Sequence, residues 1–540
     1  MSSSAYNNEP AVNPLAPVEQ LVHWLTITTI HLAVGLAIGL ITATVMRRRH
    51  LRWTWAAGAL VLVMLARRML GDGGASTLGT AALCATVRGR RWHREDIEAG
   101  ADLADFAAGR RGPLDVLRSL ARKVDVRWSA VGSESWWRAD RLTVGHERDG
   151  GAVTIPLGCV SGGTHTLIVG ATRSGKTVTM TWMAARAIER GMGAIVVDPK
   201  GDIDLRRELR DAALARGRQF LEWTPRGSSV YNPYARGSET EIADKVLAGE
   251  QFTEPHYLRQ AQRYLGHEVR VLRKATIEVS LKALVEHLDP SRLELLARSL
   301  PESQAQGAHD YLDSLTTRQQ SDLAGVRDRM AIMAESDIGP WLDPETPGVS
   351  RLDLLEAARA RAVVYFNLQA DHRPLLAQML GAAIVGDLQA MVGALQGRPV
   401  ATLVMIDEFS AIAPERVVGL FARAAGAGVS LVLGTQELAD MRVPGRDMLL
   451  EQVMGNLSVL VAHRQVVPDS AELLANMTET RGVWRTSRHG DGKFTRTRGL
   501  DRALRAGQVM SLSQGWAAVI GLSDGGGVSI ARMLSPRRCR

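Results

Sequence analysis

The sequence contains few cysteines and few aromatic residues. Its 540 residues include three cysteines, Cys84, Cys159 and Cys539, and only 5% are Phe, Trp or Tyr. The cysteines lie far apart without metal-ligand spacing, which argues against a disulfide framework or a zinc site and favours a reducing compartment for the bulk of the chain. Hydrophobic residues nevertheless make up 46%. We therefore expect a sizeable aliphatic core, and the length predicts about three or four structural units.

Charged residues are missing from a long stretch near the N-terminus. Residues 21–46 contain no Lys, Arg, Asp or Glu, and three consecutive arginines follow them. A helix of that length, at about 1.5 Å per residue, exceeds the roughly 30 Å hydrocarbon core of a bilayer. The preceding residues carry two glutamates and no basic side chain, which argues against a cleaved signal peptide. Residues 1–70 are therefore predicted to be an N-terminal membrane anchor with one firm span at 21–46.

A second apolar stretch leaves the membrane topology open. Residues 53–66 lie between Arg52 and Arg67, and a helix of this length covers only about 21 Å. If the first stretch alone spans, the positive-inside rule places the N-terminus outside and everything after Arg47 in the cytoplasm. If both span, the rest of the chain is cytoplasmic only when the arginine cluster at 47–52 lies outside, which breaks that rule. The charges favour one span followed by an interfacial helix.

Residues 71–141 are predicted to be a linker and a small adaptor region. The sequence GDGGASTLG at 71–79 is typical of a flexible linker. The net charge of +8 permits a polyanionic partner, but Arg far outnumbers Lys, and Ala and Gly are plentiful. Because high-GC coding alone can produce that bias, the global charge is weak evidence for DNA binding.

A phosphate-binding pattern follows an apolar run. Residues 165–177 read HTLIVGATRSGKT, and this Walker A pattern stands between a predicted strand and a predicted helix. Glycines let backbone N–H groups surround phosphate oxygens, and the helix N-terminus adds partial positive charge. We expect Lys176 to reach the β- and γ-phosphates of ATP and the Thr177 hydroxyl to ligate Mg²⁺. The residues predicted to bind the nucleotide are Gly170, Ala171, Thr172, Arg173, Ser174, Gly175, Lys176 and Thr177.

A second apolar strand is predicted to supply a metal ligand and a base. Residues 401–408 read ATLVMIDE, so that the strand ends in Asp407 and Glu408. This Walker B pattern, joined to the phosphate-binding loop, predicts hydrolysis: Asp407 holds Mg²⁺, and Glu408 polarises the attacking water as general base. The two motifs are far apart in the sequence, and helical periodicity over residues 238–338 predicts an all-α insertion that accounts for the gap. The NTPase domain is thus expected in two parts, 142–237 and 339–525, followed by a basic C-terminal tail at 526–540.

Three more residues are candidates because they end predicted strands or helices. Gln436 follows an apolar strand and is predicted to sense the γ-phosphate, the alternative being a polar turn. Arg423 ends a predicted helix, where it is either an arginine finger for a neighbouring subunit or a surface residue paired with a carboxylate. Asp198 ends another apolar run. It either positions metal or water, or caps the Pro-Lys-Gly turn that follows.

The ordered motifs resemble the type IV secretion coupling proteins, the TraD/TraG-like conjugation ATPases of the FtsK/HerA translocase superfamily. The resemblance covers roughly residues 143–525 and is carried by the membrane segment, HTLIVGATRSGKT, VVDPKGD, YNP, the helical insertion, LVMIDEFSAI and GTQ. It implies an α/β fold: a RecA-like P-loop NTPase domain with an all-α insertion domain and an N-terminal transmembrane helical region. Two features depart from the family, namely Arg173 where the loop often has Gly, and a very short, basic connection between the two apolar stretches.

The resemblance also implies partners and a location. It implies a homo-hexameric ring that moves DNA through a central pore by ATP hydrolysis, with relaxosome or secreted protein substrates and type IV secretion channel components as partners. It further implies contact with membrane lipid at the bacterial plasma (inner) membrane, with the ATPase domain cytoplasmic. Two other functions stay open: an FtsK/HerA-type translocase for chromosome partition or repair, and a membrane receptor for secretion substrates that hydrolyses little ATP.

A basic and aromatic segment near the C-terminus has two interpretations. Residues 484–498 interleave Arg and Lys with Trp and Phe. Such a segment is either a solvated basic hairpin or a nucleic-acid contact that combines backbone charge with base stacking.

Overall fold

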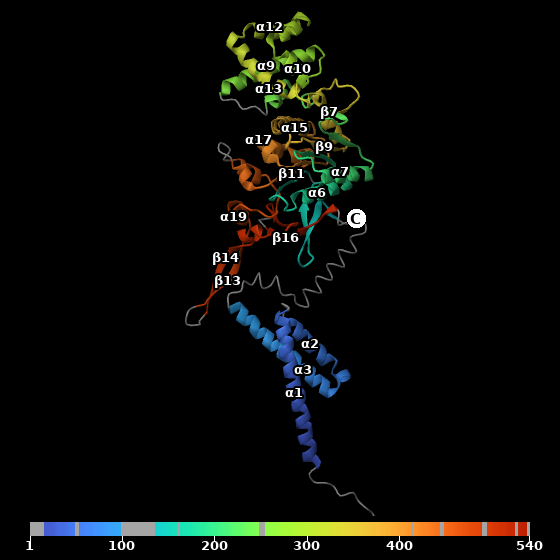
Figure 1. Ribbon diagram of the computed structural model, residues 1–540, viewed down its shortest axis with the longest axis vertical. Helices are drawn as coiled ribbons and strands as arrows, with labels where there is room; N and C mark the ends of the chain where they lie inside the picture. Colours follow the sequence, from blue (N-terminus) through green and yellow to red (C-terminus); the bar gives the residue numbers. More distant parts are fainter. Residues whose placement is uncertain are drawn as a thin grey trace, which may run out of the picture. The chain divides into compact units, whose positions relative to one another are not determined.

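The computed structural model describes residues 16–48, 53–98, 136–158, 162–247, 254–412, 414–442, 448–488, 494–523 and 527–536 (Figure 1). The chain divides into two compact units. One comprises Met1–Asp125 with Arg481–Asp501, and the other comprises Val126–Thr480 with Arg502–Arg540.

The larger unit is built around one mixed sheet, whose order is β1-β2-β16-β15-β12-β4-β11-β10-β5-β9-β6, with β3 paired to β2. From β12 to β6 neighbouring strands are parallel, whereas β12–β15, β15–β16 and β16–β2 pair antiparallel. The strands are β1 (Trp137–Arg138), β2 (Arg141–Glu147), β3 (Ala152–Pro156), β4 (His165–Val169), β5 (Gly193–Asp198), β6 (Phe220–Trp223), β9 (Val363–Asn367), β10 (Thr402–Ile406), β11 (Val429–Thr435), β12 (Val459–Ala462), β15 (Trp516–Gly521) and β16 (Gly527–Met533).

The central strands are apolar on both faces because helices cover both. Ile168 and Met405 face one core with α6 (Lys176–Arg190) and α7 (Ile203–Ala215). Leu167 and Ile406 face the other, with α15 (Pro374–Ala394) and α17 (Pro414–Ala424). Continuous apolar runs are typical of parallel strands buried on both sides. Helix α15 is also long and apolar enough to cross a membrane, but it is mostly buried in this core. The remaining short helices of this unit are α14 (Leu354–Arg359), α16 (Phe409–Ile412), α18 (Leu449–Met454), α19 (Pro468–Asn476) and α20 (Ala506–Met510), with 3-10 turns η3 (Gly339–Leu342), η4 (Ala425–Ala427) and η5 (Leu438–Met441).

An all-helical insertion interrupts the sheet between two short strands, β7 (Ser229–Tyr231) and β8 (Ser350–Leu352), which pair in parallel. Its helices are α8 (Glu239–Val246), α9 (Pro255–Lys274), α10 (Leu281–His287), α11 (Pro290–Arg298), α12 (Glu302–Asp313) and α13 (Thr317–Ala334). Local sequence sets two of the starts, because Ser238 with Glu241 and Thr316 with Gln319 form capping boxes at α8 and α13. The helical periodicity thus predicted the right type of structure for this region.

The predicted C-terminal tail is wrong in its first half. Residues Gly527–Met533 form β16, which pairs with β15 and β2. Its partner β2 lies nearly 400 residues earlier in the chain, and such a long-range pairing leaves no local signal. At the start of the domain, β2 and β3 pair antiparallel as a hairpin.

The basic segment at 484–498 lies in a two-stranded sheet of β13 (Thr480–Arg488) and β14 (Phe494–Arg502). Its backbone is therefore a hairpin. The side chains that distinguish a solvated hairpin from a nucleic-acid contact, from Trp484 to Arg498, lie outside the described residues.

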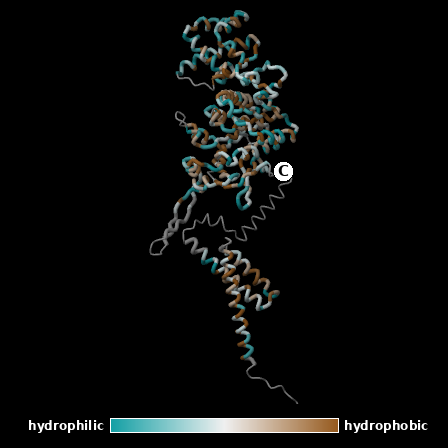
Figure 2. Tube along the Cα trace, viewed as in Figure 1, coloured by the Kyte–Doolittle hydropathy of each residue, from teal (hydrophilic) through white to brown (hydrophobic). Residues whose placement is uncertain are grey.

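The N-terminal unit contains α1 (Ala16–Arg48), α2 (Thr54–Leu65) and α3 (Arg67–Glu98), the last with a non-helical backbone at Gly71. Figure 2 shows hydrophobic residues along α1 and α2. The window Val18–Met46 is long and apolar enough to cross a membrane. The predicted flexible linker at 71–79 is wrong, because these residues belong to α3. Gly73 is a packing position rather than a sign of flexibility, because a Cβ there would lie 2.6 Å from His31 on α1. Residues 99–135, where the adaptor was predicted, lie outside the described part of the chain.

Candidate active site

The candidate site lies where four neighbouring parallel strands end. In the order β4-β11-β10-β5, Val169 is level with Thr435, and Ile406 is level with both Leu433 and Val197. The residues that follow these strand ends therefore reach one edge of the sheet. In open α/β sheets, this carboxyl edge is where ligands bind.

The phosphate-binding loop is tied to the neighbouring strands by backbone hydrogen bonds. Gly170 N–H donates to the Thr435 carbonyl at 3.2 Å, and Ala171 N–H donates to the Arg464 carbonyl at 3.0 Å. Glycine is required at both glycine positions of the Walker A pattern. A Cβ at Gly170 would lie 2.5 Å from Ser174 Oγ, and Gly175 has φ 111°.

Arg173 occupies the loop position at which the chain departs from the family pattern. Its φ is 63°, which is the left-handed region, and its side chain is exposed. A glycine adopts that conformation freely, whereas a side chain there costs about 1 kcal/mol or more. The loop therefore keeps the glycine geometry with an arginine in place, and the exposed guanidinium adds positive charge beside it.

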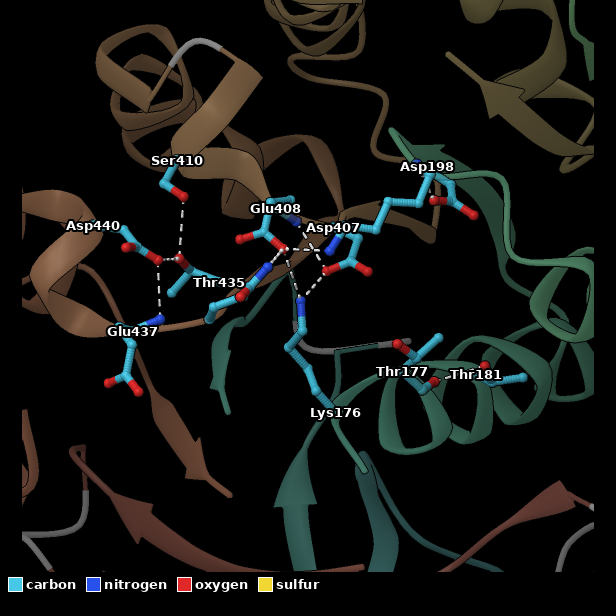
Figure 3. A network of polar contacts seen from close by, with 12 residues as sticks. Lys176, Thr177, Thr181, Asp198, Asp407, Glu408, Ser410, Thr435, Glu437 and Asp440 are labelled. Atoms are coloured by element: carbon cyan, nitrogen blue, oxygen red, sulfur yellow. Dashed lines mark hydrogen bonds and ion pairs between the residues drawn. The ribbon is translucent and has the colours of Figure 1, made fainter. Parts of the chain in front are cut away.

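Lys176, the first residue of α6, points across the sheet edge toward two carboxylates (Figure 3). Its Nζ forms a buried ion pair with Asp407 Oδ1 and lies 3.6 Å from Glu408 Oε2. The structure thus brings together the lysine, the metal-ligand candidate and the base candidate. Thr177 stands next to Lys176 on the same helix turn, where its carbonyl accepts from Thr181.

Glu408 is held from several strands at once. Its Oε2 accepts from Gln436 Nε2 at 3.2 Å and from Lys200 Nζ at 3.3 Å, and its own N–H donates to Asp407 Oδ1 at 2.9 Å. Its backbone has φ 48°. Residues in such sparsely populated conformations cluster at functional sites, where the surroundings over-determine them. Glu408 and Gln436, which were predicted separately as base and γ-phosphate sensor, are in direct contact.

Lys200 was missed by the sequence reasoning, and Asp198 explains how it is positioned. Asp198 Oδ1 accepts from the N–H groups of Lys200 and Gly201 at 2.9 and 3.0 Å, and its Oδ2 accepts from the Tyr365 hydroxyl at 2.7 Å. The carboxylate therefore caps the turn, which is one of its two predicted roles, and the turn carries Lys200 to Glu408. The sequence contains Pro-Lys-Gly directly after a strand, which was the available signal. It does not show that β5 lies beside β10 in the sheet.

A buried histidine packs beside the phosphate-binding loop and hydrogen-bonds to the helix that follows it. His463, at the end of β12, lies with Nε2 3.0 Å from the Thr179 hydroxyl on α6 and Nδ1 3.1 Å from the Trp516 carbonyl. Because a carbonyl only accepts, Nδ1 carries the proton and Nε2 accepts from Thr179. Burial lowers the pKa of His463 to about 4. Gly515 N–H also donates to the Ser174 carbonyl at 2.9 Å, so the C-terminal strands support the loop directly.

Arg423 is not brought into the site by its own chain. It lies exposed in the last turn of α17, which leads into the amino end of β11. Lys176 and Glu408 stand at the opposite, carboxyl edge of the sheet. An arginine finger at this position acts only on another subunit, so the role stays a prediction.

Known proteins place this arrangement in a family. A model of the type IV secretion-system coupling protein DNA-binding domain matches residues 151–489, which is more than half of the chain. The chain belongs to this family. No curated protein matches the sequence. The resemblance to the coupling-protein family that the motifs indicated is thus confirmed.

Solved structures confirm the predicted fold class. The bacterial conjugative coupling protein TrwBdeltaN70, in its unbound monoclinic form, matches with a TM-score of 0.54 at 14% identity, over 75% of this chain and 92% of that chain. TrwB in complex with a non-hydrolysable ATP analogue matches with 0.52 at 14% identity, over 74% and 90%. VirB4 of Thermoanaerobacter pseudethanolicus matches with 0.50 at 13% identity, over 75% and 99%. The chain is an α/β protein with a RecA-like P-loop NTPase fold and an all-α insertion, preceded by an N-terminal transmembrane helical region.

Proposed function

We propose that this coupling-protein family member is a membrane-anchored, ATP-driven DNA translocase that delivers DNA or relaxosome substrates to a type IV secretion channel. The observation that carries the proposal is the contact of Lys176 with Asp407 and Glu408, and of Glu408 with Gln436, at the tips of three parallel strands. A loop that only binds a nucleotide needs neither the second carboxylate nor the amide.

ATP and Mg²⁺ are the proposed ligands of this edge. The TrwB structures in complex with ADP and Mg²⁺ and with an ATP analogue support this assignment. The donor set fits, because Thr177 and Asp407 offer the hard oxygen ligands that Mg²⁺ prefers. Among the described residues no group of three or more His, Cys, Asp or Glu side chains could hold a metal ion. When bound, Mg²⁺ would neutralise part of the negative charge on the β- and γ-phosphates.

The ion pairs indicate how nucleotide binding prepares the base. In the structure Lys176 interacts with both Asp407 and Glu408. The incoming phosphates attract Lys176 and take it from the carboxylates. Glu408 then retains Lys200 and Gln436 as partners and accepts a proton from the attacking water. The water oxygen forms a bond to the γ-phosphorus as the bond to the β-phosphate oxygen breaks, which yields ADP and phosphate.

The other half of the site is proposed to come from a neighbouring subunit of a homo-hexamer. Arg423 lies on the opposite sheet edge of its own chain, so it serves as a finger only in trans. Gln436 is the proposed link between hydrolysis at Glu408 and the neighbouring subunit. Its side chain contacts Glu408, and its main-chain carbonyl accepts a hydrogen bond from the Gln465 side chain at 3.4 Å. Relaxosome or secreted proteins, the secretion channel and membrane lipid are the further proposed partners. The proposed location is the bacterial inner membrane, with the NTPase domain in the cytoplasm.

The experiment is ATP turnover by the full chain in detergent micelles, with single-stranded, double-stranded and no DNA. We expect DNA to stimulate hydrolysis. Lys176→Ala abolishes turnover and ATP binding, whereas Glu408→Gln retains binding and loses turnover at least about 100-fold, because only proton transfer is removed. Lys282→Ala and Glu294→Gln are matched controls, since both side chains form exposed ion pairs in the insertion. Negligible wild-type turnover with every DNA form would leave only the receptor function.

A further inference from the structure

Helix α3 packs along α1 through a stripe of small residues, and the two helices run in the same direction. A Cβ added at Gly35 would lie 2.6 Å from the Thr77 carbonyl, and one at Gly39 would lie 2.7 Å from the Ala81 carbonyl. Ala43 and Ala85 share a small buried cluster. Successive residues of α1 therefore meet successive residues of α3. Such close backbone approach through small residues is typical of helices packed within membranes.

Helix α2 returns the chain between them. A Cβ at Gly89 would lie 2.8 Å from Trp53 Cβ at the start of α2, whereas one at Gly79 would lie 3.9 Å from Val63 near its end. Helix α2 is therefore antiparallel to α3. Helices α1 and α3 therefore run in one direction, and α2 runs in the opposite direction.

The outer surface of the α2–α3 hairpin also exposes large apolar side chains. Residues 73–87 contain no Asp, Glu, Lys or Arg. On α3 the side chains of Leu78, Leu83 and Val87 are exposed, while on α2 Leu62 and Leu65 are exposed. This surface continues the exposed leucine, isoleucine and valine side chains of α1. Water is a poor solvent for such a surface, and lipid hydrocarbon is a good one.

The charges mark the two ends of this apolar layer. Because Met46 and Trp92 pack against one small cluster, the last turns of α1 lie level with the part of α3 that contains Arg88, Arg90 and Arg91. At the other end the hairpin tip holds Arg67, which pairs with Asp72 at 3.4 Å. Gly73, just after the tip, contacts His31, which lies 16 residues before Arg47 and so roughly 24 Å away. The hydrocarbon core is about 30 Å thick, and an arginine side chain reaches across the remainder by snorkelling.

We propose that α2 and α3 form a membrane-embedded hairpin, so that three helices rather than one or two occupy the bilayer, with lipid hydrocarbon as the partner of their outer surface. Because α3 runs parallel to α1, the chain leaves the membrane on the side where α1 ends. All the arginines at 47–52 and 88–94 then lie on the cytoplasmic side, with the NTPase domain, and the N-terminus lies outside. The positive-inside rule is satisfied, and the nucleotide site has access to ATP. Residues 71–79 are thus part of the anchor.

The test is thiol labelling of the full chain in membrane vesicles. In a background of Cys84→Ala, Cys159→Ser and Cys539→Ser, single cysteines are placed by Asn8→Cys, Asp72→Cys, Leu83→Cys and Ser228→Cys. A membrane-impermeant maleimide is applied to right-side-out and inside-out vesicles. We expect Asn8→Cys to react only in right-side-out vesicles and Ser228→Cys only in inside-out vesicles. Leu83→Cys reacts in neither until detergent is added, and Asp72→Cys does not react in inside-out vesicles.

The proposal is overturned if Leu83→Cys or Asp72→Cys reacts in inside-out vesicles as fast as Ser228→Cys, because α3 is then exposed to the cytoplasm. It is also overturned if the Asn8 and Ser228 positions react from the same side. Leu78→Cys gives a second position on the outer surface of α3. Each variant is checked for ATP turnover in detergent, so that loss of the motor and a wrong topology give separate readouts.

Discussion

At the scale of single residues, Glu408 concentrates the strain and the contacts of the site. Its backbone is left-handed at φ 48°, and its Oε2 is approached by Lys176, Lys200 and Gln436. A strand ending in two carboxylates, joined to the phosphate-binding loop, predicted Asp407 and Glu408 as partners of the nucleotide site that contains Lys176. The Lys200 contact depends on which strands are neighbours in the sheet. That order is a property of the assembled fold.

Lys200 is predicted to position Glu408 rather than to bind the nucleotide. Lys200→Ala is expected to lower kcat for ATP about tenfold, because Glu408 loses a charged partner 3.3 Å from its Oε2. KM is expected to stay within about twofold, since Lys200 lies outside the phosphate-binding loop. Lys200→Arg retains most of the rate. Arg207→Ala, which removes an exposed pairing with Asp204 on α7, is the control, and steady-state kinetics at saturating DNA are the measurement. A large rise in KM with unchanged kcat would show that Lys200 binds ATP instead.

His463 is predicted to make stability depend on pH below 6.5. Its pKa falls from 6.5 to about 4 on burial, so that between these pH values the unfolded chain binds the proton and the folded chain does not. Stability is therefore full above pH 6.5 and decreases toward pH 4. The loss of unfolding free energy over this pH range is on the order of 3 kcal/mol. Denaturant unfolding of the full chain at pH 4.5 and pH 7 measures it.

His463→Gln is the matched variant, because an amide also donates and accepts but does not titrate in this range. We expect it to lose less stability than wild type between pH 7 and pH 4.5. An equal loss in both proteins would assign the pH dependence to carboxylates elsewhere.

At the scale of elements, glycine was the least reliable signal in the sequence. Glycines in residues 71–79 were interpreted as a linker, yet Gly73 and Gly79 lie in α3, against α1 and α2 respectively. The same residue type in the phosphate-binding loop was interpreted correctly, because a strand before it and a helix after it fixed the context. Helical periodicity, which is also a local signal, predicted the all-α insertion. The pairing of β16 with β2 depends on residues nearly 400 positions apart, so no window of the sequence contains it.

Helix α9 of the insertion contains a buried glutamate that lowers the stability of the insertion. Glu268 is fully buried, and neither of its carboxylate oxygens has a hydrogen-bond partner among the described residues. Burial raises its pKa well above the usual value, so the stability is full below about pH 4.5 and is lost as pH rises through the folded-state value. We expect Glu268→Met to stabilise the insertion by about 1–3 kcal/mol at pH 8, because it removes an unsatisfied polar group.

Thermal unfolding at pH 6 and pH 8 measures this effect, which should be larger at pH 8. Glu294→Met, at a half-buried position of α11, is the control and should change stability by no more than about 0.5 kcal/mol. A lower midpoint for Glu268→Met at both pH values would mean that the carboxyl has a structural partner.

At the scale of the whole molecule, the chain joins an N-terminal apolar helical region to a nucleotide-binding P-loop NTPase domain. Family membership rests on residues 151–489, which contain the loop, the two carboxylates, the insertion and Arg423. The anchor lies outside that match, and its helices were only partly predicted. Apolar length identified α1, whereas α3 is rich in small and polar residues, and only its packing on α1 suggested the membrane-embedded position that we propose for it.

DNA translocation is the central claim, and displacement of a triplex-forming oligonucleotide from duplex DNA measures it most directly. Wild-type full chain should release the oligonucleotide at a rate that depends on ATP concentration. Glu408→Gln should bind ATP and DNA and release none, while Lys282→Ala should match the wild type. Robust DNA-stimulated hydrolysis without displacement from any DNA substrate, or equal displacement by Glu408→Gln, would contradict the account.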